Sequence, residues 1–266
     1  MSSVSGYAFE DLAGAHATRR VTSLPTITAG RLSVAFLPFL ALAILTPHQA
    51  VAQSEDEVVP ELWLDYNPSI AVSERVDLFG DMGYRTQLES SGWHRLVIRP
   101  NVRYAASDKV VVQGGLGSFF TWNEDEANRW ELRPWQGVSA AWPRLPFQLQ
   151  HVLRLEERFE FNTGTWDSWN SLRLRYRIRA SHQWGAWLRR DRTWRLLLSA
   201  ELFARLAGQE GQAQEQIRLV AGLERGIGPA WRARVEATWQ KAGRFFAEGS
   251  FNELFVRLRA FHDWSP

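Results

Sequence analysis

One stretch of the sequence constrains the fold more than any other. Residues 171–184, SLRLRYRIRASHQW, carry apolar side chains and tyrosine at the even positions from Leu172 to Ala180, and arginine at the four odd positions from Arg173 to Arg179. A period of two over this length is typical of a β-strand with two unlike faces. A soluble β-sandwich needs an apolar inner face, whereas a membrane β-barrel turns its apolar face to lipid and keeps a polar interior. The stretch therefore predicts a strand of a transmembrane barrel.

The first 52 residues have the pattern of an export signal. Arginines precede the apolar run Val34–Leu45, which is too short to span a bilayer, and Ala50-Val51-Ala52 resembles a cleavage site of small residues. We therefore expect a signal peptide over 1–52 with a long n-region, a mobile leader over 53–60 and a barrel over 61–266. The alternatives are a buried helix of the fold over the apolar run, and a true start codon nearer Arg31.

Composition excludes several classes of protein. The chain has no cysteine, so disulfides and thiolate metal sites are excluded, and its net charge of +2 argues against a nucleic-acid binder. After Ala52 no run of 18 apolar residues occurs, as a transmembrane helix would need. With an export signal, these exclusions leave the periplasm, secretion or the outer membrane, and we expect an outer-membrane protein without a cofactor.

Alternating segments continue along the chain and predict an all-β, antiparallel, up-and-down barrel. The loops between them are rich in glycine, asparagine and aspartate, and most segments have ten or more residues, as tilted strands that cross a bilayer need about 9–11. The segments are 61–66, 75–84, 93–104, 109–120, 130–142, 147–159, 171–184, 194–206, 215–227, 231–241 and 253–264. Bacterial barrels have an even number of strands, so we expect 10–12 strands, with 12 favoured over 10. The segment 109–120 is apolar on both parities, and its glycines indicate a bend or a close approach of another strand.

The loop lengths predict an orientation. If the last strand ends in the periplasm, the connection 243–252 is external, and so are 87–92, 122–129, 161–169 and 207–213. The same alternation starts the first strand on the external side. With an even number of strands, the first strand would start on the periplasmic side, where the last one ends, so the two expectations conflict.

The polar parity predicts the contents of the lumen. Both signs of charge occur there, and unpaired buried charges are costly, so we expect arginine–carboxylate pairs that plug the interior. The predicted lumen ion-pair network comprises Arg95, Arg99, Arg103, Glu131, Arg133, Arg154, Glu156, Arg158, Arg173, Arg175, Arg177, Arg179, Glu201, Glu224, Arg232, Arg234 and Glu236. The alternative is a small anion or solute pore, because arginine is in excess.

Aromatic residues gather at the ends of the predicted strands. An aromatic girdle at the level of the lipid headgroups has this distribution. Its predicted members are Trp93, Tyr104, Trp130, Trp142, Trp184, Trp194, Trp231 and Trp264. The implied partners are outer-membrane lipid and lipopolysaccharide, with the barrel-assembly machinery during insertion and no nucleic acid.

A third function class is an outer-membrane lipid hydrolase. His151 and His182 lie on the outward parity of neighbouring segments, near Ser181 and Glu157, and could act on a lipid. No HExxH, GxSxG, CxxC or phosphate-binding glycine loop occurs. We therefore expect no catalytic residues and no metal site. The acidic loop Asn123–Glu126 is expected to be solvated, or bridged to lipopolysaccharide by divalent cations.

Several motifs together resemble a known family. They are ELWLDY from Glu61, Gly83-Tyr84-Arg85, WHRLVIRPNVRY from Trp93, ELRPWQ from Glu131, RLEERF from Arg154 and LRLRYRIR from Leu172. The pattern resembles the DUF2490 family of bacterial outer-membrane β-barrels, over about Glu61 to Trp264. The resemblance implies a fold and a location, and it implies no activity, since none is established for the family. The chain departs from many barrels in ending two residues after Trp264 rather than on an aromatic residue.

Overall fold

The structure, a computed structural model, describes residues 58–88, 92–124, 126–142, 147–184, 193–208, 215–243 and 251–264. Every regular element within these ranges is a β-strand. The strands are β1 (Val58–Ala71), β2 (Val76–Gln87), β3 (Trp93–Ala105), β4 (Val110–Asn123), β5 (Arg129–Trp142), β6 (Gln148–Asn162), β7 (Ser168–Trp184), β8 (Trp194–Gly208), β9 (Glu215–Gly226), β10 (Trp231–Gly243) and β11 (Phe251–Trp264). The predicted signal peptide lies outside the described residues.

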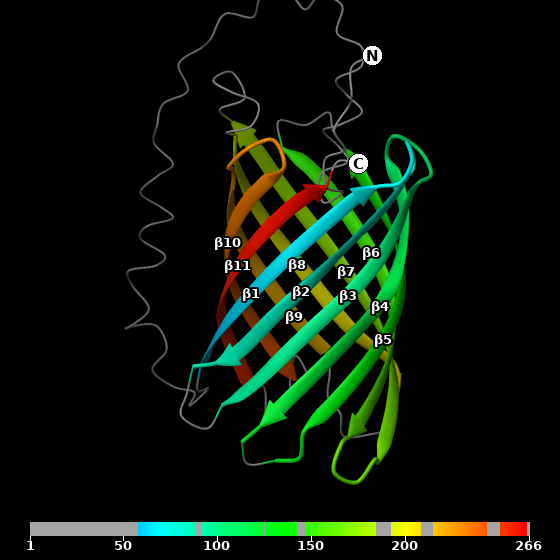
Figure 1. The fold of residues 1–266 in the computed structure, drawn as a ribbon, viewed down its shortest axis with the longest axis vertical. Helices are drawn as coiled ribbons and strands as arrows, with labels where there is room; N and C mark the ends of the chain where they lie inside the picture. Colours follow the sequence, from blue (N-terminus) through cyan, green and yellow to red (C-terminus); the bar gives the residue numbers. More distant parts are fainter. Residues whose placement is uncertain are drawn as a thin grey trace, which may run out of the picture.

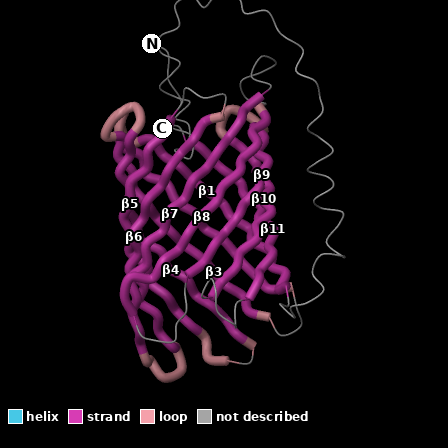
Figure 2. Tube along the Cα trace, turned by 180° about the vertical axis from the view of Figure 1, so that it is seen from behind, coloured by secondary structure: helices cyan, strands magenta, loops and turns pink. Residues whose placement is uncertain are grey.

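The strands form one closed barrel (Figure 1). Each strand pairs antiparallel with the next in sequence, from β1 through to β11. Seen from behind, the wall is equally complete (Figure 2). The prediction of an all-β, up-and-down barrel is confirmed.

The number of strands lies within the predicted 10–12, but the preference for an even number, with 12 favoured, is wrong. Eleven strands close the barrel, and β1 and β11 pair in parallel over the whole ladder from Val58↔Asn252 to Ile70↔Trp264. With an odd number of strands the first and the last run in the same direction, so only a parallel ladder can join them. Val58 and Val59 pair with β11 as well, so β1 begins three residues before the predicted start of the barrel at Glu61.

The odd number also resolves the conflict over orientation. Five connections are predicted to be external. The strand ends on either side of each of them lie at the end of the barrel where β1 begins. The C-terminal end of β11 lies at the opposite end (Figure 1). The first strand therefore does start on the side of those connections, and no strand is missing to correct it.

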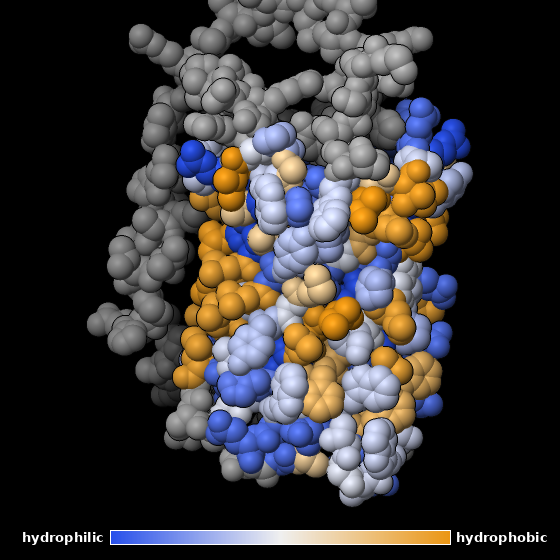
Figure 3. Space-filling model, in the orientation of Figure 1, coloured by the Kyte–Doolittle hydropathy of each residue, from blue (hydrophilic) through white to orange (hydrophobic). Residues whose placement is uncertain are grey.

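The two faces of the wall are inverted relative to a soluble protein. Apolar side chains in the middle of the strands point outward, and Leu198 and Leu258 are 47% and 44% exposed. Charged side chains point inward, and Glu156 and Arg234 are 0% and 3% exposed. Hydrophobic residues accordingly cover much of the outer surface between the two polar rims (Figure 3). The alternation of side chains along each strand produces both faces at once.

The glycines of β4 allow the close approach that the sequence indicates. Gly115 pairs with Asn101 of β3, and a Cβ atom at this position would overlap the Asn101 side chain and lie 2.6 Å from the carbonyl oxygen of Pro100. Asn101 Oδ1 in turn accepts a hydrogen bond of 3.0 Å from the indole of Trp135 on β5. The missing side chain at Gly115 makes room for this inward contact across three strands.

Candidate functional site: the charged lumen

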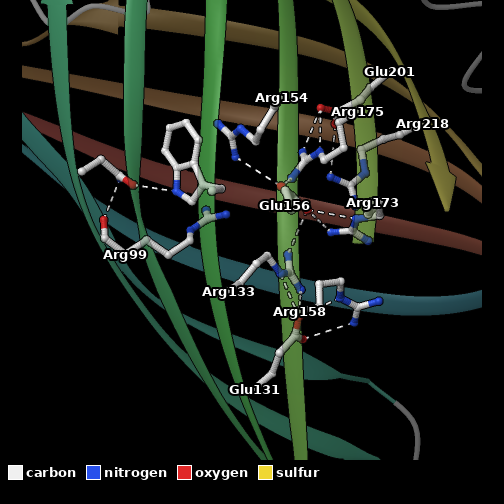
Figure 4. Close-up of polar contacts among 12 residues, drawn as sticks. Arg99, Glu131, Arg133, Arg154, Glu156, Arg158, Arg173, Arg175, Glu201 and Arg218 are labelled. Carbon is white, nitrogen blue, oxygen red and sulfur yellow. Dashed lines mark hydrogen bonds and ion pairs between the residues drawn. The ribbon is translucent and has the colours of Figure 1, made fainter. Parts of the chain in front are cut away.

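Glu156 on β6 is the centre of the largest ion-pair cluster in the lumen. Its carboxylate oxygens lie 2.5 Å from guanidinium nitrogens of both Arg173 and Arg175, 3.5 Å from Arg154 and 3.9 Å from Arg133 (Figure 4). Arg173 faces Glu156 directly across the β6–β7 ladder. Four cations around one anion need further carboxylates for neutrality.

Two carboxylates supply that charge on either side of the cluster. Glu131 lies on β5 and Glu201 on β8, and both side chains are buried. Their ion pairs are Glu131 with Arg133 (2.6 Å) and Arg158 (2.7 Å), and Glu201 with Arg175 (2.8 Å) and Arg218 (3.6 Å). The cluster is therefore continuous from β5 to β9 (Figure 4).

A second cluster lies on β8 to β11. Its carboxylates are Glu224, 2% exposed, and Glu236, 7% exposed. Glu224 pairs with Arg195 (2.9 Å), Arg232 (3.5 Å) and Arg234, and Glu236 pairs with Arg234 (3.1 Å), Arg257 (3.7 Å) and Arg259 (3.5 Å). Arg234 joins the two carboxylates, because it contacts both.

Cross-strand pairs complete the wall on β1 to β3. Arg99 binds Asp81 through both Nε and Nη2, at 2.9 and 2.6 Å. Arg103 lies 3.0 Å from Asp77. Across the parallel closure, Arg257 of β11 lies 2.5 Å from Asp65 of β1. Forked guanidinium groups suit such planar contacts.

Aromatic side chains of the inward face hold many of these guanidinium groups. Their rings are buried between the charged layers, and cation–π contact stabilises a desolvated guanidinium by about 1–2 kcal/mol. Arg85 lies 3.8 Å from the ring centroid of Trp63, Arg154 3.8 Å from Trp135, Arg133 4.2 Å from Phe119, Arg175 4.6 Å from Phe203 and Arg234 4.5 Å from Phe261. The role of these aromatic residues was not predicted, although their parity places them inside.

The structure places all 17 residues of the predicted lumen network on the inward parity of their strands. Among them Arg95 differs from the arginines that pair with carboxylates, because its Nε–H donates a 2.7 Å hydrogen bond to the hydroxyl of Thr121. Asp77 and Asp81 also lie inside, as their parity predicts. Inward charged residues that the prediction omitted, despite the same parity signal, are Glu61, Asp65, Arg85, Glu160, Arg195, Arg218, Glu253, Arg257 and Arg259.

A cavity of about 440 Å³ remains inside the barrel. Fifteen arginines and seven carboxylates line it, together with inward aromatic side chains. The free surface of the lumen is therefore rich in guanidinium groups.

Seven of the eight residues predicted for the aromatic girdle lie on the outward parity. Tyr104, Trp142, Trp184, Trp194, Trp231 and Trp264 lie at the end of the barrel where β11 ends, and Trp130 lies at the other end. The assignment of Trp93 needs correction. It lies at the start of β3 on the inward parity, lines the cavity and has the Arg95 guanidinium 4.7 Å from its ring centroid. Alternation from the first residue of the strand places it inside.

The outward histidines do not assemble the hydrolase site considered above. His151 Nδ1 lies 2.6 Å from the Tyr176 hydroxyl, and the rings of Phe147 and Trp184 lie beside His182. Ser181 belongs to the inward parity of β7, so its hydroxyl lies on the opposite face of the wall. The geometry gives no sign of catalysis.

No group of three or more histidine, aspartate or glutamate side chains in the described ranges could hold a metal ion. No helix within them is long and apolar enough to cross a membrane.

Comparison with known proteins found one family. Curated proteins gave no match, and solved structures gave none either. A family model described as "Protein of unknown function (DUF2490)" matches residues 61–245, from β1 to the end of β10. This chain belongs to the DUF2490 family.

Proposed function

We propose that this protein is an outer-membrane β-barrel with a lumen closed by ion pairs, in a structural or transport-related role. The inversion of the wall carries the proposal. Leucines at mid-strand, such as Leu64 and Leu258, are more than 40% exposed, while inward arginines such as Arg103 and Arg234 are 3% exposed. In water such a continuous apolar belt would cause association, whereas in a bilayer it meets hydrocarbon.

Two further features support this location. An export signal over 1–52, cleaved after Ala52, would deliver the barrel to the envelope. Outward tryptophans near one rim, among them Trp142, Trp184 and Trp264, are 43–52% exposed and suit a headgroup layer. The expected partners are therefore outer-membrane lipid and lipopolysaccharide, with the assembly machinery during insertion.

Fractionation of cells that express the full chain tests the location. The protein should sediment with outer membranes, require detergent for extraction and migrate differently on gels before and after boiling. An Ala50→Leu, Ala52→Leu variant should accumulate a longer, unprocessed product. A wild-type protein that is soluble without detergent would refute the proposal.

The closed lumen is a separate part of the proposal. The ion pairs of Glu131, Glu156 and Glu201 connect five adjacent strands and occupy the interior between them. A barrel filled in this way should give a flat current trace in a planar bilayer at all voltages. Open steps of stable size would show that the lumen conducts.

A small anion pore is the second candidate, favoured by the extent of the cavity. Its lining includes Arg129 and Glu160, near the end where β1 begins, and Ser69 and Arg103, near the opposite end. Its surface carries more arginine than carboxylate. A reversal potential that follows the chloride gradient would establish this function in place of the closed lumen.

A further inference from the structure

Arginines face one another directly across four ladders of the inward wall. Like charges in opposed positions of adjacent strands repel, because their Cβ atoms lie only about 5 Å apart. The pairs are Arg85↔Arg95, Arg154↔Arg175, Arg173↔Arg205 and Arg234↔Arg259. Each pair therefore needs an anion nearby.

Carboxylates of the chain supply that anion to three of the four pairs. Glu156 lies 2.5 Å from Arg175 and 3.5 Å from Arg154, and thus bridges that pair. Glu156 also lies 2.5 Å from Arg173, and so supplies an anion to the pair Arg173↔Arg205. Glu236 bridges the pair of β10 and β11, 3.1 Å from Arg234 and 3.5 Å from Arg259. The wall has thus a recurrent arrangement of two opposed arginines and one oxyanion.

The pair Arg85↔Arg95 lacks that third member. Within the described ranges no carboxylate oxygen lies within 4.0 Å of either guanidinium. Arg85 is 6% exposed, and its Nε has no hydrogen-bond partner in the described part of the chain. Arg95 donates its Nε–H to the Thr121 hydroxyl at 2.7 Å. A buried and a part-buried cation in repulsion, with unused N–H groups, are costly unless an anion is bound.

Neighbouring side chains hold the two guanidinium groups in place. Arg85 stacks on Trp63, 3.8 Å from the ring centroid, and Arg95 lies 4.7 Å from the centroid of Trp93. The nearby carboxylate of Glu61 is engaged elsewhere, since it accepts a 2.6 Å hydrogen bond from the Trp63 indole. The same indole thus contacts both Arg85 and the Glu61 carboxylate.

The surrounding cavity favours an anion from outside the chain. Both arginines line it. Besides the seven lining carboxylates, four other carboxylates pair with lining arginines: Asp65, Asp77 and Glu156 on the inward face, and Glu126 in a loop. Among the described residues, fifteen arginines line the cavity and these eleven carboxylates lie around it, so arginine is in excess there.

We propose that Arg85 and Arg95 form a binding site for a small oxyanion, a phosphate or a carboxylate. The oxyanion takes the position that Glu156 holds between Arg154 and Arg175. Guanidinium forks bind both groups through paired N–H···O contacts. The inference rests on the proposed function only in that the lumen is the polar interior of a barrel.

Binding to the detergent-purified full chain tests the site without a membrane. Isothermal titration at constant ionic strength compares inorganic phosphate, acetate and chloride. Saturable binding of phosphate or acetate is expected, with chloride much weaker, and the preferred oxyanion identifies the ligand class. Since a charge-assisted hydrogen bond contributes about one to two factors of ten to affinity, Arg85→Gln should weaken binding at least about tenfold.

Variants separate the site from a general effect of charge. Arg95→Gln should weaken binding as Arg85→Gln does. The heat-dependent gel shift reports whether each variant folds, and Arg95→Gln replaces Arg85→Gln in the test if the latter does not fold. Arg75→Gln removes the same charge from an exposed position and should leave affinity unchanged. Glu61→Gln should tighten binding, because it removes a competing negative charge.

Any one of three results would overturn the proposal: no saturable oxyanion binding to the wild type, equal affinity in the Arg85 and Arg75 variants, or loss of binding in Glu61→Gln. None of these depends on conductance or on cell fractionation, so the site and the proposed function can fail independently.

Discussion

Replacement of Glu156 by glutamine should destabilise the barrel more than removal of any exposed charge. The side chain is 0% exposed, and its carboxylate pairs with four arginines, two of them at 2.5 Å. Glutamine keeps the volume of the side chain and removes its charge, so Arg173 and Arg175 would share one neutral acceptor. Breaking a buried ion pair by removal of one partner costs about 3–5 kcal/mol. We expect Glu156→Gln to lose stability in this range.

The matched control is Glu126→Gln. Glu126 pairs with Arg129 at 2.7 Å, but the two side chains are 65% and 51% exposed. An exposed pair contributes at most about 1 kcal/mol. Urea unfolding of the refolded protein, followed by tryptophan fluorescence and by the gel shift, measures both variants. Equal small losses in the two variants would refute the view that buried ion pairs organise the lumen.

Three other predictions concern the wall, and the same unfolding assay checks each. Gly115→Val should cost about 1–3 kcal/mol, because its side chain would collide with the carbonyl of Pro100, and a neutral outcome would contradict the close approach. Asp65→Asn leaves Arg257 without its 2.5 Å partner at the parallel closure and should cost about 3–5 kcal/mol. Adding Arg257→Gln should recover part of that loss, and strict additivity would argue against coupling. Leu258→Arg, at an outward position in mid-strand, should cost about 2–4 kcal/mol in lipid vesicles if that face meets hydrocarbon, and no loss would contradict this.

The faces of the strands could be predicted because they follow from local alternation alone. Leu198 points outward and Glu201 inward for the same reason that successive side chains alternate in any strand. The glycine-rich β4 broke the pattern, since Gly115 and Gly117 occupy inward positions without a side chain. Its neighbours on both sides still specified a strand there.

The strand count could not be predicted from the rule used. An even number of strands is common in bacterial barrels, but closure of a barrel does not require it. The parallel ladder of β1 and β11 closes the barrel with the same continuity as the antiparallel ladders, and Asp65 and Arg257 meet across it. Such a contact between residues 192 positions apart has no local signal.

Partners within the lumen were equally hidden, because they depend on register. Parity placed Glu156, Arg173 and Arg175 inside, but only the β6–β7 ladder sets Glu156 opposite Arg173. Arg85 was recognised only as part of a family motif. Its lack of a carboxylate becomes visible once its opposition to Arg95 is known.

The arrangement of the two faces is the central claim, and a scan of spin labels along β11 tests it most directly. The chain has no cysteine, so single cysteines can be placed at successive positions from Leu254 to Phe261 and labelled in lipid vesicles. Labels at Leu254, Val256, Leu258 and Ala260 should collide with dissolved oxygen, and those at the alternate positions should be shielded from it, with a period of two. Contact of a water-soluble nickel complex with Leu258, together with oxygen-rich surroundings at Arg257 and Arg259, would contradict the account.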